Sequence, residues 1–533
     1  MPDRPAPRRA ALPENADLGH LRGQARTLQR GVRRGDPAAL RRIRAQGLAA
    51  GSGGTGAAVP LDAFPLSAAQ LAVAREYGFA SWPRLKHHLD TVARYRWDPA
   101  ATADPEPDET SADRFCRLAC LGYTPADGPD RWARAAALLA DEPGLVNAHS
   151  GAAAAAADVA ALRRHLAADP SAAVRHSGPY GWSPLFHLVY SRLNAPSGDA
   201  PAAARLLLEA GADPHEGYLW HGLPSPFTLL TGAFGEGEQG PERQPRHPDA
   251  LALARLLLDA GADPADSQAL YNRMFGSDDD HLVLLFAHGL AESDGGVWKS
   301  RLGDALATPG EMLRGQLGWA VDHRMPERVR LLAAHGVDLR TPLDGSTGST
   351  GGTFAERAQR NGDPELVALL VAHGADAPVP TPAEALLGAA LAGDGAAVTA
   401  LRAAHPEAAG EARAARPSAM VWAAAQGPAQ GRAQGSPQGR AEVLGLLAGL
   451  GFDVNALGRG DIPSDQPWET ALHHAAMAGD VPSVRLLLSL GADRTVRDRR
   501  FDGTPLDWAR HFGQEETAAV LAAEPGVTGP PPG

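Results

Sequence analysis

Residues 470–493 decide the fold: they read Thr470-Ala-Leu-His-His-Ala-Ala-Met-Ala-Gly479-Asp-Val-Pro-Ser-Val-Arg-Leu-Leu-Leu-Ser-Leu-Gly491-Ala-Asp493. Nine positions separate the threonine from the first glycine, and twelve separate the two glycines. One or both intervals recur elsewhere, at Thr353/Gly362/Gly374, Thr504/Gly513, Gly35/Gly47 and Gly439/Gly451. Fixed spacing of this kind indicates an internal repeat, which is better interpreted as stacked units than as separate globular domains.

Each landmark of the repeat predicts a helix boundary. Thr504-Pro505 places a hydroxyl N-cap before a proline, and Thr353–Glu356 and Thr381–Glu384 have the spacing of capping boxes. The middle glycine ends a short first helix, and an aspartate then caps the second helix at Asp36, Asp363, Asp394 and Asp480. That second helix carries a Leu-Leu pair and ends at a glycine suited to the left-handed conformation, at Gly211, Gly261, Gly374 or Gly491.

Four segments carry a family resemblance. Thr470-Ala-Leu-His473-His-Ala and Thr504-Pro-Leu-Asp507-Trp-Ala resemble the Thr-Pro-Leu-His-x-Ala signature of ankyrin repeats, and the Leu-Leu-x-x-Gly-Ala-Asp endings at Gly211 and Gly261 resemble that family's second helix. The similarity is clearest in 183–290, 353–376 and 465–523. Phe186, Glu356 and Asp507 depart from the signature histidine, which puts the local turn hydrogen bonds in question. Residues 74–86 also resemble a segment that precedes the array in some bacterial ankyrin proteins.

The resemblance implies an all-α fold, an ankyrin-repeat α-solenoid of stacked helix-turn-helix pairs. Such a scaffold recognises other proteins through its concave helix face and turn tips. No helix pair buries its apolar face alone, so the continuous core comes from stacking. The sequence therefore predicts a non-catalytic protein-protein interaction scaffold with a protein partner of unknown identity.

Composition shifts divide the chain. We expect a disordered tail at 1–20, a helical N-terminal module at 21–96, an acidic Pro-rich linker at 97–111, an array at 112–523 and a second tail at 524–533. Insertions interrupt the array at 214–224, 233–249, 338–352 and 426–440. Gly51–Gly56 matches G-x-G-x-x-G, but no strand precedes it, so we interpret it as a linker.

Composition also restricts function. The 533 residues are 44% hydrophobic and 21% charged, which is a normal globular balance. A net charge of −12 argues against nucleic acid as the main ligand. Two cysteines cannot build a disulfide framework. Without a signal sequence or an apolar run that could span a bilayer, the sequence predicts a cytoplasmic protein with no membrane contact.

Several groups of cysteine, aspartate and histidine residues could have a catalytic or metal-binding role, but each also has a structural explanation. Cys116 and Cys120 share a helix face and lack further zinc ligands, so we expect buried cysteines. Asp278-Asp279-Asp280-His281 could bind a metal, but it precedes a Leu-Leu helix whose N-terminus favours anions. His288, His335 and His373 precede helix-ending glycines, and His473 occupies the histidine position of the repeat. We therefore predict no catalytic residues, metal or cofactor.

Aromatic residues near turns are the expected partner-binding residues. Tyr180, Trp182, Tyr218, Trp220, Phe227, Trp319 and Trp468 lie in or near turns and helix starts, and we add His221. The insertion segment 217–227 is the preferred patch. The alternative interpretation is that these rings fill gaps left by the insertions.

Two other functions stay open. The first is an enzyme with a site hidden in residues 21–150, which include the N-terminal module, or in the 214–250 insertion. The second is a regulator that contacts nucleic acid through the basic N-terminus, where eight arginines lie between Arg22 and Arg44. The competing interpretation of these arginines is a solvated helix face.

Overall fold

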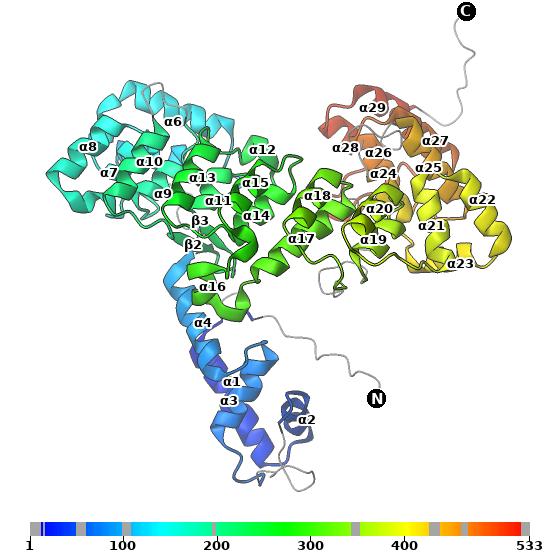
Figure 1. Cartoon of the computed structure of the whole chain (residues 1–533), viewed down its shortest axis with the longest axis horizontal. Helices are drawn as coiled ribbons and strands as arrows, with labels where there is room; N and C mark the ends of the chain where they lie inside the picture. Colours follow the sequence, from blue (N-terminus) through cyan, green and yellow to red (C-terminus); the bar gives the residue numbers. More distant parts are fainter. Residues whose placement is uncertain are drawn as a thin grey trace, which may run out of the picture. The chain divides into compact units, whose positions relative to one another are not determined.

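The computed structural model describes residues 12–13, 16–48, 60–98, 108–193, 199–342, 352–425, 437–459 and 467–523. The chain is mostly helical, with 61% helix (Figure 1). It forms two compact units, Met1–Met312 and Leu313–Gly533. The expected linker Gly51–Gly56, the tail 524–533 and most of the insertion 426–440 lie outside the described residues.

The first unit begins with a module of four helices. These are α1 (Leu18–Arg33), α2 (Pro37–Ala45), α3 (Leu66–Glu76) and α4 (Trp82–Tyr95). Their apolar faces meet in a core that includes Leu21, Ile43 and Phe64. Since α1 starts at Leu18 behind an Asp17 N-cap, the helical part of the chain begins inside the stretch 1–20 that we expected to be a tail.

The rest of the first unit is a succession of short helices: α5 (Ser111–Ala119), α6 (Pro129–Asp141), α7 (Ser150–Ala155), α8 (Val159–Ala168), α9 (Pro184–Tyr190), α10 (Ala200–Glu209), α11 (Leu229–Phe234), α12 (Gly240–Arg243), α13 (Ala250–Asp259), α14 (Ser267–Met274), α15 (Asp280–Ala287) and α16 (Gly296–Leu302). The helices α5, α7, α9 and α11 pack side by side, and α8, α10 and α13 pack likewise. Helix α17 (Pro309–Asp322) contains the division between the units.

A small sheet corrects the all-α expectation. Strand β1 (Arg96–Trp97) pairs in parallel with β2 (Gly217–Trp220), and β2 pairs antiparallel with β3 (Pro226–Thr228). Residues of β2 alternate between buried and half-buried positions, as a strand requires. The insertion at 214–224 therefore supplies the first strand of a hairpin that β3 completes, because its alternating side chains can cover the core on one face.

The N-terminal module packs on the rest of the first unit. Arg84 forms an ion pair with Asp304 at 2.7 Å, and the Tyr95 ring meets the Trp298 ring edge-on with 5.0 Å between centroids. Strand β1 directly follows α4 and continues this contact into the sheet. The sequence had left open whether the module packs on the helices that follow.

The second unit contains α18 (Pro326–Ala334), α19 (Phe354–Arg360), α20 (Pro364–Ala372), α21 (Pro382–Ala392), α22 (Gly395–Ala404), α23 (Ala408–Ala415), α24 (Ala419–Ala425), α25 (Pro437–Gly449), α26 (Ala471–Met477), α27 (Val481–Ser489), α28 (Pro505–His511) and α29 (Glu515–Ala522). The pair α26–α27 packs against the pair α28–α29. Their facing side chains, Leu487 among them, belong to one buried cluster.

The landmarks of the repeat have the predicted roles. The Thr470 N–H donates to His473 Nδ1 at 3.2 Å, and His473 Nε2–H donates to the Gly503 carbonyl at 3.1 Å. Asp480 caps α27 by accepting from the Ser483 N–H at 3.1 Å. Gly491 has φ +91°, the left-handed conformation expected at the end of the second helix.

Two helices that lack the signature histidine, α28 and α19, still have a closed N-cap. Asp507 accepts from the Thr504 N–H at 2.9 Å, and Glu356 accepts from the Thr353 N–H at 2.8 Å. The capping box at Thr381 is also closed by Glu384. A carboxylate thus replaces imidazole as the acceptor, which confirms the predicted helix starts.

The expected linker at 97–111 lies within the first compact unit, and residues 99–107 of it are not described. The domain boundary there stays a prediction. In the described stretches of the chain, no helix combines the length and the apolar composition needed to cross a bilayer.

Candidate protein-binding surface

A tight turn between α27 and α28, which we call the C-terminal finger, comprises residues 498–503. Asp498 lies at its centre and is almost fully buried. One carboxylate oxygen accepts from the Arg500 and Phe501 N–H groups at 2.9 and 2.6 Å. The other accepts from the Gly503 N–H and the Trp508 indole, both at 2.9 Å. These four bonds hold the backbone of the finger in one conformation.

The charge on Asp498 is stabilised by this geometry. Burial acts to raise the pKa of the carboxyl, but the hydrogen bonds from Phe501, Trp508, Gly503 and Arg500 outweigh it and bring the pKa below its ordinary value. Asp498 is therefore ionised at neutral pH and serves as a fixed anchor for the turn.

The finger presents an aromatic and cationic surface. Phe501 is 66% exposed. The Arg500 guanidinium lies 5.1 Å from the Trp468 ring centroid and 5.3 Å from that of Phe501. The two rings are 5.9 Å apart, and Trp508 packs beneath them. A large apolar ring held out by a rigid turn is a suitable anchor for a partner protein.

Six of the eight predicted site residues gather in the first unit. Trp182 is at the centre and contacts Tyr180, Phe186, Tyr190 and Tyr218. Trp97, which the sequence did not single out, lies 5.2 Å from the Trp182 ring. Trp182 is fully buried. The turn aromatics meet because the insertion folds back as a hairpin over α9.

Burial corrects the expected patch at 217–227. Phe227 is 8% exposed and packs on Tyr123, so Trp182 and Phe227 are core residues. Tyr218, Trp220 and His221 are only half-buried. His221 lies 3.3 Å from the Asp98 carboxylate. The interpretation that these rings fill space between insertions describes Trp182 and Phe227 better than partner contact does.

The remaining two predicted residues lie in the second unit. Trp319 is half-buried on α17 and stacks on His323 with 3.6 Å between ring centroids. Trp468 is half-buried at the finger. Of the predicted set, Trp468 is therefore the residue that touches an exposed aromatic anchor.

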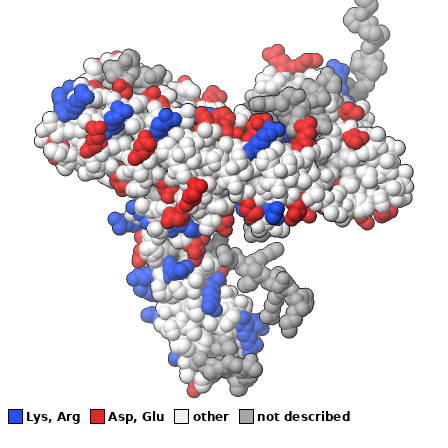
Figure 2. Space-filling view, in the orientation of Figure 1, with Lys and Arg blue, Asp and Glu red and all other residues white. Residues whose placement is uncertain are grey.

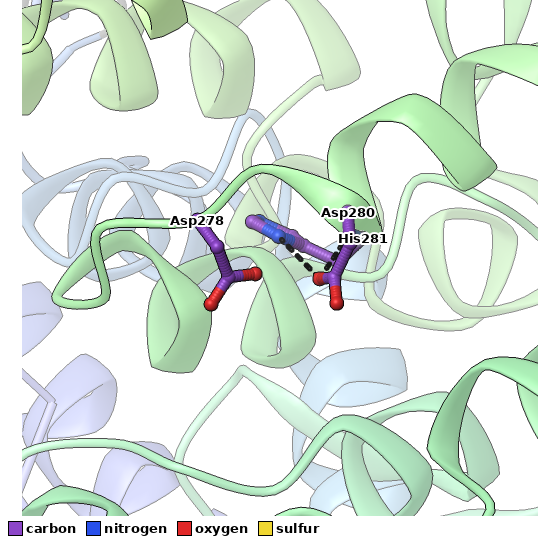
Figure 3. A group of neighbouring side chains, drawn as sticks. All are labelled: Asp278, Asp280 and His281. Carbon is purple, nitrogen blue, oxygen red and sulfur yellow. Dashed lines mark hydrogen bonds and ion pairs between the residues drawn. The ribbon is translucent and has the colours of Figure 1, made fainter.

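The candidate metal group at α15 is engaged by arginines. Asp278, Asp280 and His281 come within 4.8 Å of one another (Figure 3). Arg273, whose side chain is buried, bonds Asp278 at 2.6 Å, and Arg246 bonds Asp280 at 2.6 Å. Two guanidinium groups thus neutralise the carboxylates that a cation would need. Helix α15 begins at Asp280, as predicted.

Other titratable groups have structural roles. Cys116 and Cys120 are buried, and burial raises the pKa of Cys120 to about 12, so its thiol stays protonated. His288 and His373 each donate from Nδ1–H to the carbonyl four residues before, at 2.8 and 2.9 Å. These contacts confirm the predicted helix-end role.

One arrangement near the region of the enzyme alternative resembles a relay. Ser177 Oγ lies 3.3 Å from His149 Nδ1, and His149 Nε2 lies 3.3 Å from Asp113. His149 is also the N-cap of α7, where its Nδ1 accepts from the Ala152 N–H at 3.0 Å. Since that lone pair already caps the helix, it is not free to act as a base for the serine.

Comparison with known families agrees with the geometry at the C-terminal end. Residues 468–499 match the family described as Ankyrin repeat. The matched segment contains Trp468, both helices α26 and α27, and the first residues of the finger. No family is assigned to the rest of the chain. No curated protein matches the chain. An ankyrin repeat suggests a protein-binding role in general.

Sequence reasoning missed Phe501 and the arginines beside it. The signal was present: the turn reads Asp498-Arg-Arg-Phe-Asp-Gly503, which combines a large aromatic residue with two cations between two predicted helices. It does not stand out in the sequence because exposure of Phe501 depends on what packs against the turn from elsewhere in the chain.

Proposed function

We propose that the chain is a non-catalytic protein-interaction scaffold, with ankyrin-type helix pairs stacked through residues 112–523, and that the C-terminal finger is its main contact with a partner. The observation that supports this proposal is the exposed Phe501 ring, which lies beside Trp468 on a turn that Asp498 holds rigid. Little conformational entropy is lost when a pre-ordered turn binds, so more of the contact energy goes into affinity.

The positive charge of the finger indicates which class of partner it binds. Arg499 and Arg500 are exposed beside the rings, and neither forms an ion pair with a carboxylate among the described residues. Guanidinium groups recognise carboxylates through paired N–H donors. The partner segment is therefore acidic and carries an aromatic or leucine side chain that packs on Phe501 and Trp468.

Selection of a random-peptide display library on the full chain tests this. We expect enriched peptides with several carboxylates around an aromatic or leucine residue. The double variant Phe501→Ala/Arg500→Ala should lose at least tenfold in affinity for them. The control Val283→Ala removes an exposed side chain of α15, outside both the finger and the segment 217–227, and it should bind normally.

Three outcomes would contradict the proposal. These are enrichment of basic peptides, equal binding by the double variant, and a failure to enrich any peptide on the intact chain. The double variant removes only exposed side chains, so it should keep the wild-type melting temperature.

A further inference from the structure

The N-terminal module has the opposite charge to the chain as a whole. Residues 16–98 contain thirteen Lys and Arg against six Asp and Glu, whereas the complete chain has a net charge of −12. Figure 2 shows mainly Lys and Arg over the helices of this module on the face in view. The excess is concentrated in α1 and α2, whose sequences contain no acidic residue.

The arginines of α1 form a row along one side of the helix. They are Arg22, Arg26, Arg30 and Arg33, with Arg34 at the C-cap, and all are exposed. At 100° and 1.5 Å per residue they occupy an arc of about 120° and a length of about 18 Å. The opposite side of α1 is buried in the module core through Leu21, Ala25, Leu28 and Val32. The core thus fixes the direction in which the arginine row points.

None of these side chains forms an ion pair with a carboxylate within the described residues. The nearest acidic influence is Asp17, whose pKa is lowered mainly by the hydrogen bond from the His20 N–H and in smaller part by Arg22. Arg33 donates to the Phe64 carbonyl at 3.1 Å and Arg30 to the Thr27 hydroxyl at 3.4 Å, both neutral acceptors. Arginine is common throughout the chain, so abundance alone says little. On α10 and α13, however, Arg205 and Arg255 each have a carboxylate residue four positions on, Glu209 and Asp259. On α1 the neighbours at that spacing are further arginines.

Such a row is unfavourable for the isolated helix. Like charges four residues apart destabilise a helix, and α1 has three such pairs, Arg22/Arg26, Arg26/Arg30 and Arg30/Arg34. A merely solvated face would intersperse both signs, as on α10 and α13. The row is explained by a ligand that is itself a row of anions.

We propose that the arginine row of α1 is a docking surface for the phosphate backbone of a nucleic acid. Guanidinium groups bind phosphate through paired donors, and a line of fixed cations matches a regular polyanion. No large hydrophobic side chain of the described module is exposed, so a protein partner would find no apolar anchor here. Because the apolar side of α1 is buried, the helix cannot insert into a lipid surface.

The test uses the full chain with a fluorescein-labelled 24-base-pair DNA duplex and a 24-nucleotide RNA, titrated between 50 and 200 mM salt. We expect binding that weakens with salt. The variant Arg22→Gln/Arg26→Gln/Arg34→Gln should lose at least tenfold in affinity at low salt. For the duplex, its log–log salt slope should be shallower by about 2–3, since each phosphate contact contributes about 0.9.

Two control variants show whether the position of the charges matters and whether charge alone suffices, and a melting measurement shows whether the glutamine variant is folded. Arg205→Gln/Arg255→Gln/Arg485→Gln removes the same charge from other exposed helix positions and should bind almost normally. Lysine at positions 22, 26 and 34 keeps the charge and should retain most of the binding. The glutamine variant should melt no lower than wild type, because it relieves repulsion in α1.

The proposal is wrong if neither probe binds at 50 mM salt, or if the control triple variant loses as much affinity as the α1 variant. It is also wrong if vesicles of anionic lipid bind in place of both nucleic acids. The finger variant Phe501→Ala/Arg500→Ala should bind the probes normally, so this test is independent of the proposed protein partner.

Discussion

Replacing Asp498 with asparagine should lower the free energy of local opening of the C-terminal finger by about 2–4 kcal/mol. The amide keeps one acceptor oxygen, so two of the four hydrogen bonds survive, and its NH2 group faces the two remaining donors. Hydrogen bonds to a charged group contribute about 1.5–3 kcal/mol each, so two lost bonds set an upper range of about 3–6 kcal/mol. The finger is close to solvent, and water recovers part of this.

Hydrogen exchange of the full chain, followed by mass spectrometry, measures the effect. Since 1.4 kcal/mol is about a factor of ten, exchange in the segment 498–512 should accelerate by about 30-fold or more. Asp394→Asn is the matched control. Asp394 caps α22 through one bond from the Ala397 N–H, and asparagine caps a helix equally well. Exchange within threefold of wild type at the finger would refute the anchoring role of Asp498.

The pH dependence of the finger's stability follows from the same four hydrogen bonds to Asp498. The pKa of Asp498 lies below its ordinary value of 3.8. The stabilisation by the carboxylate is thus fully present above about pH 4 and is lost as pH falls through the lowered pKa. The difference between wild type and Asp498→Asn, corrected for intrinsic exchange rates, should therefore shrink at pH 3 relative to pH 5. A difference that stays constant across this range would mean that ionisation of Asp498 does not matter.

Three further changes test the fold. Leu487→Ala empties a fully buried position between two helix pairs and should cost about 2–5 kcal/mol, seen as a lower urea midpoint of the full chain. Gly491→Ala has space for its methyl group but must keep φ near +91°. We expect a loss of about 1 kcal/mol of unfolding free energy in the same assay, because alanine is strained in this conformation. An unchanged urea midpoint would count against backbone strain at this position. Burial lowers the pKa of His187 from 6.5 to about 4. Its neutral form is the folded one, so stability should fall as pH drops from 6.5 towards 4, and His187→Gln should flatten the melting temperature over pH 7 to 5.

Local structure was the most predictable part of the molecule. The caps at Thr470, Asp480 and Thr504 and the left-handed Gly491 were all expected from spacing, because a helix end is decided by a few neighbouring residues. Substitution of Glu356 and Asp507 for the signature histidine was harder to judge from sequence. Both close the cap because any acceptor at that position serves.

The long-range arrangement was less predictable. Trp182 and Phe227 were expected at a surface and are buried. Rings from β1, β2 and α9 surround Trp182, and Phe227 on β3 packs on Tyr123. The ion pairs of Asp278 and Asp280 depend on Arg246, more than thirty positions away. The sequence shows each of these side chains but not its neighbour.

The sequence by itself determined the helix ends at Thr470, Asp480, Gly491 and Thr504 and the basic character of the N-terminus, because these properties depend on spacing and composition. Tertiary structure alone decided which aromatic rings reach solvent, that Phe501 and Trp468 form one surface, and that the α1 arginines face away from the module core. Exposure depends on what packs against a residue from distant parts of the chain, and that information is absent from any local stretch of sequence.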